Sequence, residues 1–318
     1  MSVDYRPLAG TGLAVSSIGL GAAPLGGEYG SVEVETAVAA VHTALELGVT
    51  LIDVSPYYGR TAAETVLGQA LRGIDRDSYV LATKVGRYDL AEFDFSAGRV
   101  ARSVHESLDR LGTDHLDLVQ CHDVEFSDLD QIVEETLPAL RSLQSDGVIR
   151  AVGVTGLPIP ALAYVVERAP VDTVLSYCHY TLQNRTLGGW LPFFADHGVG
   201  VLNASPLAMG LLTEGGPPAW HPAPAALRSA CARAAELCRA EGTDLATLAL
   251  RFALTLPGVA STLVGLASPE IVRRSLDAAA GPIDAELLTA VRAVLADQLD
   301  VSWPSGRPEN ASPPRVAR

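Results

Sequence analysis

The stretch LIDVSPYYGRTAAETVLGQ, from Leu51 to Gln69, contains the features that decide the fold. Its first residues form a short apolar run that ends in Asp53, which is typical of a buried strand. A turn rich in proline and glycine follows and carries Tyr58. An amphipathic helix pattern then begins at about Ala62. The stretch is therefore one strand–loop–helix unit with an acid at the strand end and a phenol in the loop.

The same unit recurs along the chain. Strands are predicted at 15–19, 49–53, 79–84, 116–121, 149–154, 173–177, 200–204 and 261–264. Helices are predicted at 32–47, 62–71, 97–111, 129–145, 159–168, 187–197, 225–256 (with a break near Gly242) and 269–279. Strict alternation predicts a parallel sheet with helical crossovers. Eight units favour an α/β fold of the closed (β/α)8 TIM-barrel type, and a doubly wound open sheet is the competing topology.

The glycine pattern bears on this choice. Gly-x-Gly pairs occur at Gly10/Gly12 and Gly19/Gly21, but neither is followed by a third glycine at the spacing of a Rossmann phosphate turn. We therefore expect one barrel over residues 1–306, with a small hairpin before residue 15 that caps the barrel floor. The Pro-rich segment 307–318 is expected to be a disordered tail.

Composition limits the classes of partner. The chain has 318 residues, is 48% hydrophobic and carries a net charge of −14, so it is typical of a globular protein and unlike a nucleic-acid or anionic-membrane binder. No apolar run is long enough for a membrane span, and no signal peptide is visible. The four cysteines form no metal-binding spacing and indicate reduced core residues of a cytoplasmic protein.

Ionisable residues stand at three successive strand ends: Asp53, Lys84 and His122. Barrel enzymes place their chemistry at the carboxyl ends of the strands, so these three side chains and Tyr58 are expected to meet. The set suits proton transfer coupled to hydride transfer. Lys84 is expected to lower the pKa of Tyr58, Asp53 to hold the ammonium, and His122 to orient a carbonyl oxygen.

The same residues carry a family resemblance. The motifs LIDVSPYYG, ATKVG, QCHD, GVTGLP and ASPLAMGLLTEGGPPAWHP resemble the aldo-keto reductase superfamily, over essentially the whole chain. The segments FDFSAGRV, VLSYCHY and SPLAMGLLTE are similar to its plant-type L-galactose dehydrogenase branch in particular. The resemblance implies a catalytic tetrad of Asp53, Tyr58, Lys84 and His122. It also implies a nicotinamide cofactor bound in an extended form without a Rossmann domain.

By the same resemblance, cofactor contacts fall at strand ends and on two later segments. They are Gly21, Ala22, Asp53, Thr155, Gly156, Tyr177, Ser205, Leu207, Gly210, Leu212, Gly265, Ser268, Arg274 and Ser275. The family's usual residues are replaced at Gly156, Tyr177 and Ala204. Two arginines, Arg273 and Arg274, would accommodate the 2′-phosphate of NADP, whereas the branch resemblance favours NAD.

The substrate pocket is expected to form from the long loops and the tail. Candidate contacts are Tyr57, Tyr88, Phe126, His179, Trp220 and Trp303, because aromatic faces and polar edges bind sugars. A metal site is not expected; His115, with Asp114 and Asp117, lies at the non-catalytic end.

The predicted activity is an NAD(P)-dependent oxidoreductase of the aldo-keto reductase type. It would oxidise an aldose such as L-galactose, or an L-fucose-like sugar, at C1 to the lactone, with Tyr58 as general acid/base. Reduction of a pyridoxal-like or other aldehyde is the alternative at the same site. Two other classes are a non-catalytic cofactor-sensing partner subunit and a lyase or isomerase using Lys84 as a Schiff-base amine. The protein could form a homo-oligomer.

Overall fold

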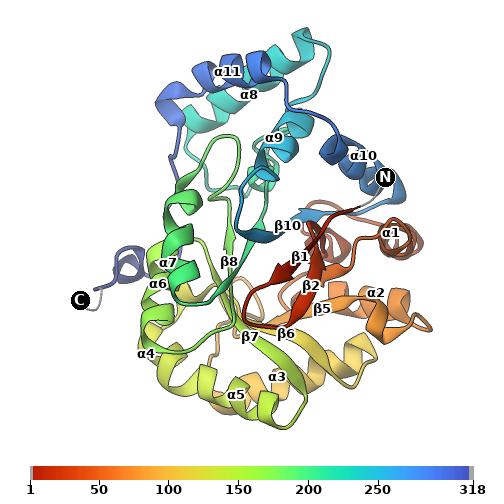
Figure 1. The fold of residues 1–318 in the computed structure, drawn as a ribbon, viewed down its shortest axis with the longest axis vertical. Helices are drawn as coiled ribbons and strands as arrows, with labels where there is room; N and C mark the ends of the chain where they lie inside the picture. The colour runs from red at the N-terminus through yellow and green to blue at the C-terminus, as the bar shows by residue number, and fades with distance from the viewer. Residues whose placement is uncertain (1–2, 315–318) are drawn as a thin grey trace.

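Eight parallel strands close into a barrel in the computed structural model, which describes residues 3–314 (Figure 1). The barrel strands are β3 (Ile18–Gly21), β4 (Leu51–Asp53), β5 (Val80–Val85), β6 (Leu116–Cys121), β7 (Ile149–Gly156), β8 (Thr173–Tyr177), β9 (Gly200–Ala204) and β10 (Val259–Gly265). They follow one another in chain order, and β10 pairs with both β9 and β3 to close the ring. The predicted TIM barrel is confirmed.

Helices surround the barrel and bury their apolar faces against it. They are α1 (Val34–Glu46), α2 (Ala62–Leu71), α3 (Ala97–Leu111), α4 (Leu129–Gln131), α5 (Leu137–Ser145), α6 (Ile159–Arg168), α7 (Leu191–Asp196), α8 (Ala225–Ala240), α9 (Leu245–Ala253), α10 (Pro269–Ala280) and α11 (Ala285–Val294). A π-helical turn, Ile132–Thr136, joins α4 to α5. A large hydrophobic cluster lies between helices and strands, and a smaller one fills the barrel interior.

Most predicted elements agree with the structure within a few residues, and three do not. The predicted strand 15–19 runs across the boundary between β2 (Leu13–Ser16) and β3, because the chain turns at Ser16 and Ser17. Helix α11 was not predicted, although Asp284 caps it by accepting bonds from two backbone N–H groups. The predicted helix 187–197 begins as a 3-10 turn, Thr186–Trp190, before α7. The expected break near Gly242 is confirmed between α8 and α9.

The predicted hairpin is also confirmed. Strands β1 (Tyr5–Leu8) and β2 pair antiparallel and lie across the amino-terminal end of the barrel. Leu8 and Val15 are buried in the interior cluster beside Leu51 and Leu118. The hairpin therefore seals the barrel floor with apolar side chains, and the chemistry is left to the opposite end.

Residues after Arg307 are more ordered than the sequence indicated. Pro308–Ala311 forms a 3-10 turn, and buried Asn310 donates through Nδ2 to the backbone oxygens of Glu125 and Ser127 at 2.9 and 2.8 Å. The expectation of disorder from residue 307 was wrong for this turn, because a buried amide secures it. Residues 315–318 lie outside the described part of the chain.

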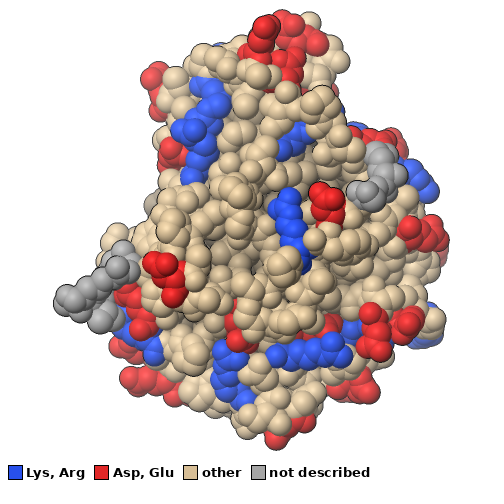
Figure 2. All heavy atoms as spheres, viewed as in Figure 1, with Lys and Arg blue, Asp and Glu red and all other residues tan. Residues whose placement is uncertain are grey.

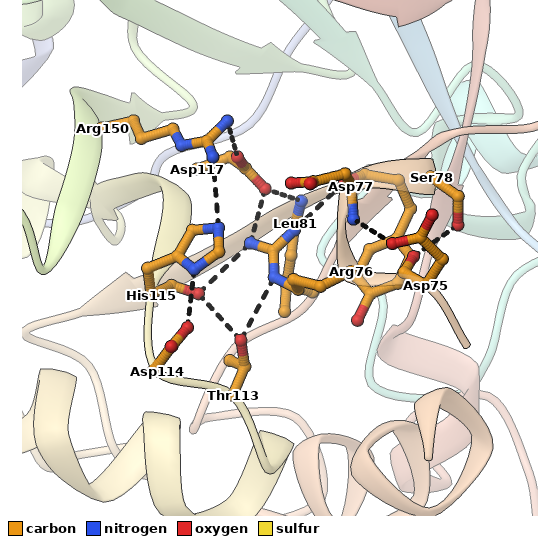
Figure 3. A network of polar contacts seen from close by, with 11 residues as sticks. Asp75, Arg76, Asp77, Ser78, Leu81, Thr113, Asp114, His115, Asp117 and Arg150 are labelled. Atoms are coloured by element: carbon orange, nitrogen blue, oxygen red, sulfur yellow. Dashed lines mark hydrogen bonds and ion pairs between the residues drawn. The ribbon is translucent and has the colours of Figure 1, made fainter. Parts of the chain in front are cut away.

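A buried carboxylate organises the amino-terminal ends of β5 and β6 (Figure 3). Oδ2 of Asp117 accepts from the backbone N–H of Leu81 at 2.8 Å and from Nη2 of Arg76 at 2.7 Å. Its other oxygen lies 3.3 Å from Nη1 of Arg150. His115 contacts Asp114 and Arg150. Among residues 3–314 no cluster of three or more His, Cys, Asp or Glu is placed to hold a metal ion.

Replacing Asp117 by asparagine is expected to destabilise the protein by about 3 kcal/mol, because the substitution leaves two arginines facing a neutral amide at a buried site. The midpoint of thermal unfolding measures this change. Asp114→Asn is the matched control, since the Asp114 side chain is 93% exposed. Equal midpoints for the two variants would contradict the structural role of Asp117.

The surface carries charges of both signs. On the face drawn in Figure 2, acidic and basic side chains are scattered among uncharged ones, and the described residues form no broad basic area there.

The four cysteines are buried with free thiols, in agreement with their interpretation as core residues. No helix within residues 3–314 has the length and hydropathy needed to cross a bilayer.

Candidate active site

The four predicted catalytic side chains meet at the carboxyl ends of neighbouring strands. Asp53 ends β4, Lys84 lies near the end of β5, and His122 directly follows β6. The loop after β4 brings Tyr58 to the same place. Because these strands are hydrogen-bonded neighbours, residues far apart in sequence come into direct contact.

Lys84 is the centre of this group. It is 1% exposed, and its Nζ donates to Oδ1 of Asp53, to the backbone oxygen of Val54 at 2.9 Å and to Oη of Tyr58 at 3.1 Å. All three donors of the ammonium are therefore used. The second oxygen of Asp53 accepts from Nε2 of Gln120 at 3.0 Å, which fixes the carboxylate. Gln120 was not among the predicted site residues.

The orientation of His122 follows from Ser55. Nδ1 of His122 lies 2.9 Å from Oγ of Ser55, and this oxygen already accepts from the backbone N–H of Tyr57 at 3.1 Å. With the hydroxyl proton of Ser55 directed to Nδ1, the proton of the neutral ring lies on Nε2, and this is the tautomer used below. Burial lowers the pKa of His122 well below its usual value, and the charges of Lys84 and Arg87 lower it further. His122 is thus a neutral hydrogen-bond donor.

The expected effect of Lys84 on Tyr58 was wrong. Burial raises the pKa of Tyr58 well above 10, and the negative charges of Asp53 and Asp123 add to this rise. The negative charge of Asp53, which is paired with Lys84, offsets the effect of the ammonium on the tyrosinate. The phenol is therefore protonated in this state of the protein and can act as an acid.

An ion pair that was not predicted lies next to the tetrad. Nη1 of Arg87 donates to Oδ2 of Asp123, and this oxygen lies 3.7 Å from Nε2 of His122. The guanidinium lies over the ring of Tyr57, with its central carbon 3.8 Å from the ring centroid. The sequence signal was the acid that directly follows His122 in QCHD.

A second missed acid, Glu125, is fully buried on the loop after β6. Its Oε1 accepts from Oγ of Ser305 at 2.8 Å and from the backbone N–H of Leu157 at 3.1 Å. Burial and the nearby charge of Asp123 raise the pKa of Glu125 to about 8. The acid helps to hold the segment around Ser305 against the barrel rim.

The predicted cofactor contacts near the barrel axis lie at the ends of β3, β7, β8 and β10. Gly21 pairs with both Asp53 and Gly265, and the backbone N–H of Ala22 donates to the oxygen of Asp53 at 2.8 Å. Oγ1 of Thr155 accepts from the backbone N–H of Asp123 at 3.0 Å. A Cβ added to Gly156 would lie 2.7 Å from Oε2 of Glu125.

Tyr177 ends β8, and its hydroxyl lies 3.4 Å from Oε1 of Glu125. Tyr177 and Thr155 therefore lie on the same rim as the tetrad and contact residues of the loop after β6.

The segment after β9 has an unusual backbone. Ser205, Ala208, Met209 and Gly210 all have positive φ, between 47° and 96°. Such strain in non-glycine residues is typical of ligand-binding loops, and successive turns of this kind present backbone N–H groups to anions. Leu207 and Leu212 close the segment by a bond from the Leu212 N–H to the Leu207 oxygen at 3.1 Å. The N–H groups of Ala208, Gly210 and Leu212 already donate to oxygens of the same segment, so its strained backbone is the feature that makes it a candidate ligand-binding loop.

An open cleft of ≈ 660 Å³ lies at the start of α10. It is lined by Ser268, Pro269, Glu270, Arg273, Arg274 and Asp277. Oγ of Ser268 caps the helix by accepting from the N–H of Ile271 at 3.2 Å, and Ser275 lies on the same helix. Two basic and two acidic side chains line the cleft, so the charges balance there.

The candidate substrate contacts after β4, β5 and β6 differ in their placement. Tyr57 and Phe126 lie beside Arg87, and Phe126 stacks on Phe93 at a centroid distance of 4.6 Å. Tyr88 is buried elsewhere in the scaffold: its Oη accepts from the N–H of Gly86 at 3.2 Å, and Arg99 covers its ring. This placement does not support a substrate contact for Tyr88.

The remaining substrate candidates lie on the loops after β8 and β9 and on the segment around Trp303. His179 is buried, with Nε2 3.5 Å from Oγ of Ser302, and burial lowers its pKa to about 4. Trp303 contacts the ring of His221 at 4.8 Å. Trp220 is 53% exposed and packs against Tyr29 at 5.7 Å, so the loops after β3 and β9 meet there. Tyr29 was not predicted.

Comparisons with known proteins agree with this fold. Residues 17–296 match the family described as the Aldo/keto reductase family. The chain is similar to an L-galactose dehydrogenase of Arabidopsis thaliana, with 46% identity over 317 residues that cover 97% of this chain and 99% of the relative. It is 37% identical over 249 residues to a D-arabinose 1-dehydrogenase of Saccharomyces cerevisiae, covering 74% and 73%. The holo structure of an aldo-keto reductase from Bacillus halodurans superposes with a TM-score of 0.77 at 28% identity, covering 92% of this chain and 96% of that one.

Proposed function

The chain belongs to the aldo/keto reductase family, and we propose that it oxidises an aldose such as L-galactose or an L-fucose-like sugar at C1 to the lactone, with NAD or NADP as hydride acceptor. The observation that carries the proposal is the contact of Lys84 with both Asp53 and Tyr58, next to His122. The relatives named for aldose oxidation support the substrate class.

Each residue of the tetrad has a part in this reaction. The oxygen on C1 binds between Oη of Tyr58 and Nε2 of His122, whose rings lie 5.6 Å apart at their centroids. A bound nicotinamide supplies the acceptor for the hydride that leaves C1. The proton of the C1 hydroxyl passes to the oxygen of Tyr58 in oxidation and returns from it in reduction. Lys84 positions the phenol, and Asp53 holds the ammonium in place.

NAD is proposed as the preferred cofactor. The cleft at α10 carries Glu270 and Asp277 beside Arg273 and Arg274, and the two acids oppose the binding of an additional phosphate group. The strained loop after β9 is the segment proposed to bind the diphosphate, which both cofactors share.

The other classes of function fit the site less well. A Schiff-base mechanism needs a neutral lysine, whereas the amine of Lys84 is ion-paired and donates three hydrogen bonds. A subunit that only senses a cofactor has no need of an assembled tetrad. Reduction of an aldehyde is the reverse reaction and uses the same groups. It therefore does not compete with the proposed function as a separate class.

A panel of aldoses and aldehydes tests the proposal, with the absorbance of the reduced cofactor as the readout and with NAD and NADP supplied separately. We expect aldoses, L-galactose among them, to be oxidised to lactones, and NAD to give the higher kcat/KM. The absence of turnover of every aldose with both cofactors would overturn the proposal.

The rate of oxidation is expected to rise with pH. Because the pKa of Tyr58 is raised well above 10, only a small fraction of the phenol is ionised at neutral pH, and that fraction grows about tenfold per pH unit. The kcat/KM for aldose oxidation should therefore increase from pH 7 to pH 9. The reduction of glyceraldehyde, which uses the protonated phenol, should change little over this range. A flat profile for oxidation would contradict the acid–base role.

A further inference from the structure

Two charged side chains beside the tetrad have no part in the proton transfer described above. Arg87 follows β5 and Asp123 follows β6, and they form an ion pair whose side chains are 15% and 4% exposed. An ion pair taken out of water contributes little net stability, because the loss of hydration offsets the attraction. Stability alone therefore does not explain why these charges lie at the mouth of the barrel.

The backbone of Asp123 supports a functional role. Its φ of 54° and ψ of 60° are left-handed, a conformation that costs free energy for a residue with a side chain and that persists mainly at functional sites. In this conformation the carboxylate lies next to His122, with Oδ2 3.7 Å from Nε2. A molecule that accepts a hydrogen bond from Nε2 of His122 therefore has Asp123 within reach of its neighbouring group.

Arg87 presents donors to the same place. Its guanidinium is held over the ring of Tyr57, with the rings of Phe93 and Phe126 at 5.3 and 5.4 Å from its central carbon. Nη1 is used by Asp123, while the buried Nε has no hydrogen-bond partner among the described residues. A guanidinium has five N–H donors, so the bond to Asp123 leaves other donors of Arg87 for a ligand oxygen.

The chemistry of the pair specifies what it can bind. A carboxylate only accepts hydrogen bonds and a guanidinium only donates them, so together they recognise a group that does both. In a cyclic aldose, C1 is bonded to C2, which carries a hydroxyl, and to the ring oxygen, which accepts hydrogen bonds but cannot donate them. With O1 held by Tyr58 and His122, the hydroxyl on C2 is the neighbouring group that matches the pair.

We propose that Arg87 and Asp123 bind the hydroxyl on the carbon next to the reacting carbinol, and that they thereby select 2-hydroxy aldoses over substrates that lack this hydroxyl. The inference rests on the proposed function and adds two specificity residues to it. Asp123 accepts the hydroxyl proton, and Arg87 donates to the hydroxyl oxygen. No covalent step is involved.

The first test uses the unaltered protein with L-galactose and 2-deoxy-L-galactose. Hydrogen bonds to charged groups are stronger than those between neutral groups, so we expect kcat/KM for L-galactose to exceed that for the 2-deoxy sugar by about ten- to a hundredfold. Equal values would overturn the inference and leave the proposed function standing. If neither sugar is oxidised but another aldose of the panel is, the same ratio is measured for that aldose and its 2-deoxy form, and equal values again overturn the inference. Failure of every aldose would overturn both.

The second test uses two variants. Asp123→Asn removes the charge and keeps a residue type that tolerates left-handed backbone, and Arg87→Met keeps most of the apolar stem. In each, the ratio of kcat/KM for the two sugars should fall to about a tenth of the wild-type ratio. The loss should be confined to L-galactose and should lie mainly in KM, with cofactor affinity measured by fluorescence unchanged.

Asp172→Asn is the matched control. It removes the charge from another aspartate–arginine pair, Asp172 with Arg141, at the amino-terminal end of the barrel. This variant should keep the wild-type ratio between the two sugars. If Asp123→Asn and Arg87→Met also keep it, the pair does not bind the C2 hydroxyl and the inference is overturned.

Discussion

Tyr58→Phe is expected to lower kcat for aldose oxidation by about 10²–10⁴-fold, the range that positioned acid–base groups contribute. The substitution removes only the hydroxyl that Lys84 contacts at 3.1 Å and leaves the ring against His122. The affinity for cofactor, measured by fluorescence titration without sugar, should stay within about twofold, because no cofactor contact is proposed for this oxygen.

The control for this variant is Tyr79→Phe. Tyr79 is buried at the amino-terminal end of the same barrel, beside Arg76, so its hydroxyl is far from the tetrad along β5. We expect wild-type kcat for Tyr79→Phe. If Tyr58→Phe retained full turnover, the phenol would have no part in the chemistry and the proposed mechanism would fall with it.

Lys84→Met is expected both to abolish turnover and to destabilise the fold. Asp53 would be left as a buried carboxylate without its cation, which costs about 3–5 kcal/mol. Burial already raises the pKa of Asp53, and Lys84 opposes that rise. In the variant the carboxyl group would bind a proton more readily, so the loss of stability should be smaller at low pH.

The double variant Asp53→Asn with Lys84→Met separates the two effects. With both charges removed, the free energy of unfolding should return to within about 1 kcal/mol of the wild type, because no unpaired charge is left buried and a neutral amide costs much less to desolvate. Turnover should remain abolished, because the amine that positions Tyr58 is still missing. Denaturant unfolding and kcat measured on the wild type and on the two variants check this. A double variant as unstable as Lys84→Met, or one that regained activity, would contradict the assigned roles.

The barrel and its tetrad could be predicted from sequence because both depend on local patterns. Each strand is a short apolar run, and Asp53, Lys84 and His122 lie where such runs end. Neighbouring parallel strands bring their carboxyl ends to one rim of the barrel. A residue at the end of a predicted strand can therefore be placed at that rim from the sequence alone. The boundary at Ser16 could not be predicted, because the turn depends on its Oγ donating to the oxygen of Ile18 and accepting from the N–H of Thr50, a distant residue.

The charges around the tetrad were harder to predict, because they depend on side-chain contacts between loops. The sequence suggested that Lys84 lowers the pKa of Tyr58, yet the negative charge of Asp53 offsets the charge of Lys84. The pair of Arg87 and Asp123 joins two loops, and the left-handed backbone at Asp123 has no glycine to signal it. Substrate contacts were assigned from residue type alone, so Tyr88 was included although its ring is packed within the scaffold.

Strand β6 is held by polar contacts at both of its ends. Near its start, Asp117 contacts Arg76 and the N–H of Leu81, and near its end Gln120 contacts Asp53. A parallel strand could slide by two residues during folding and still direct every side chain to its correct face, so apolar packing distinguishes the two alignments poorly. Such a slide would displace both polar groups by about 6.6 Å and leave each buried without its partner. The polar groups at the two ends of β6 therefore make a barrel with a shifted register less stable than the correctly aligned one.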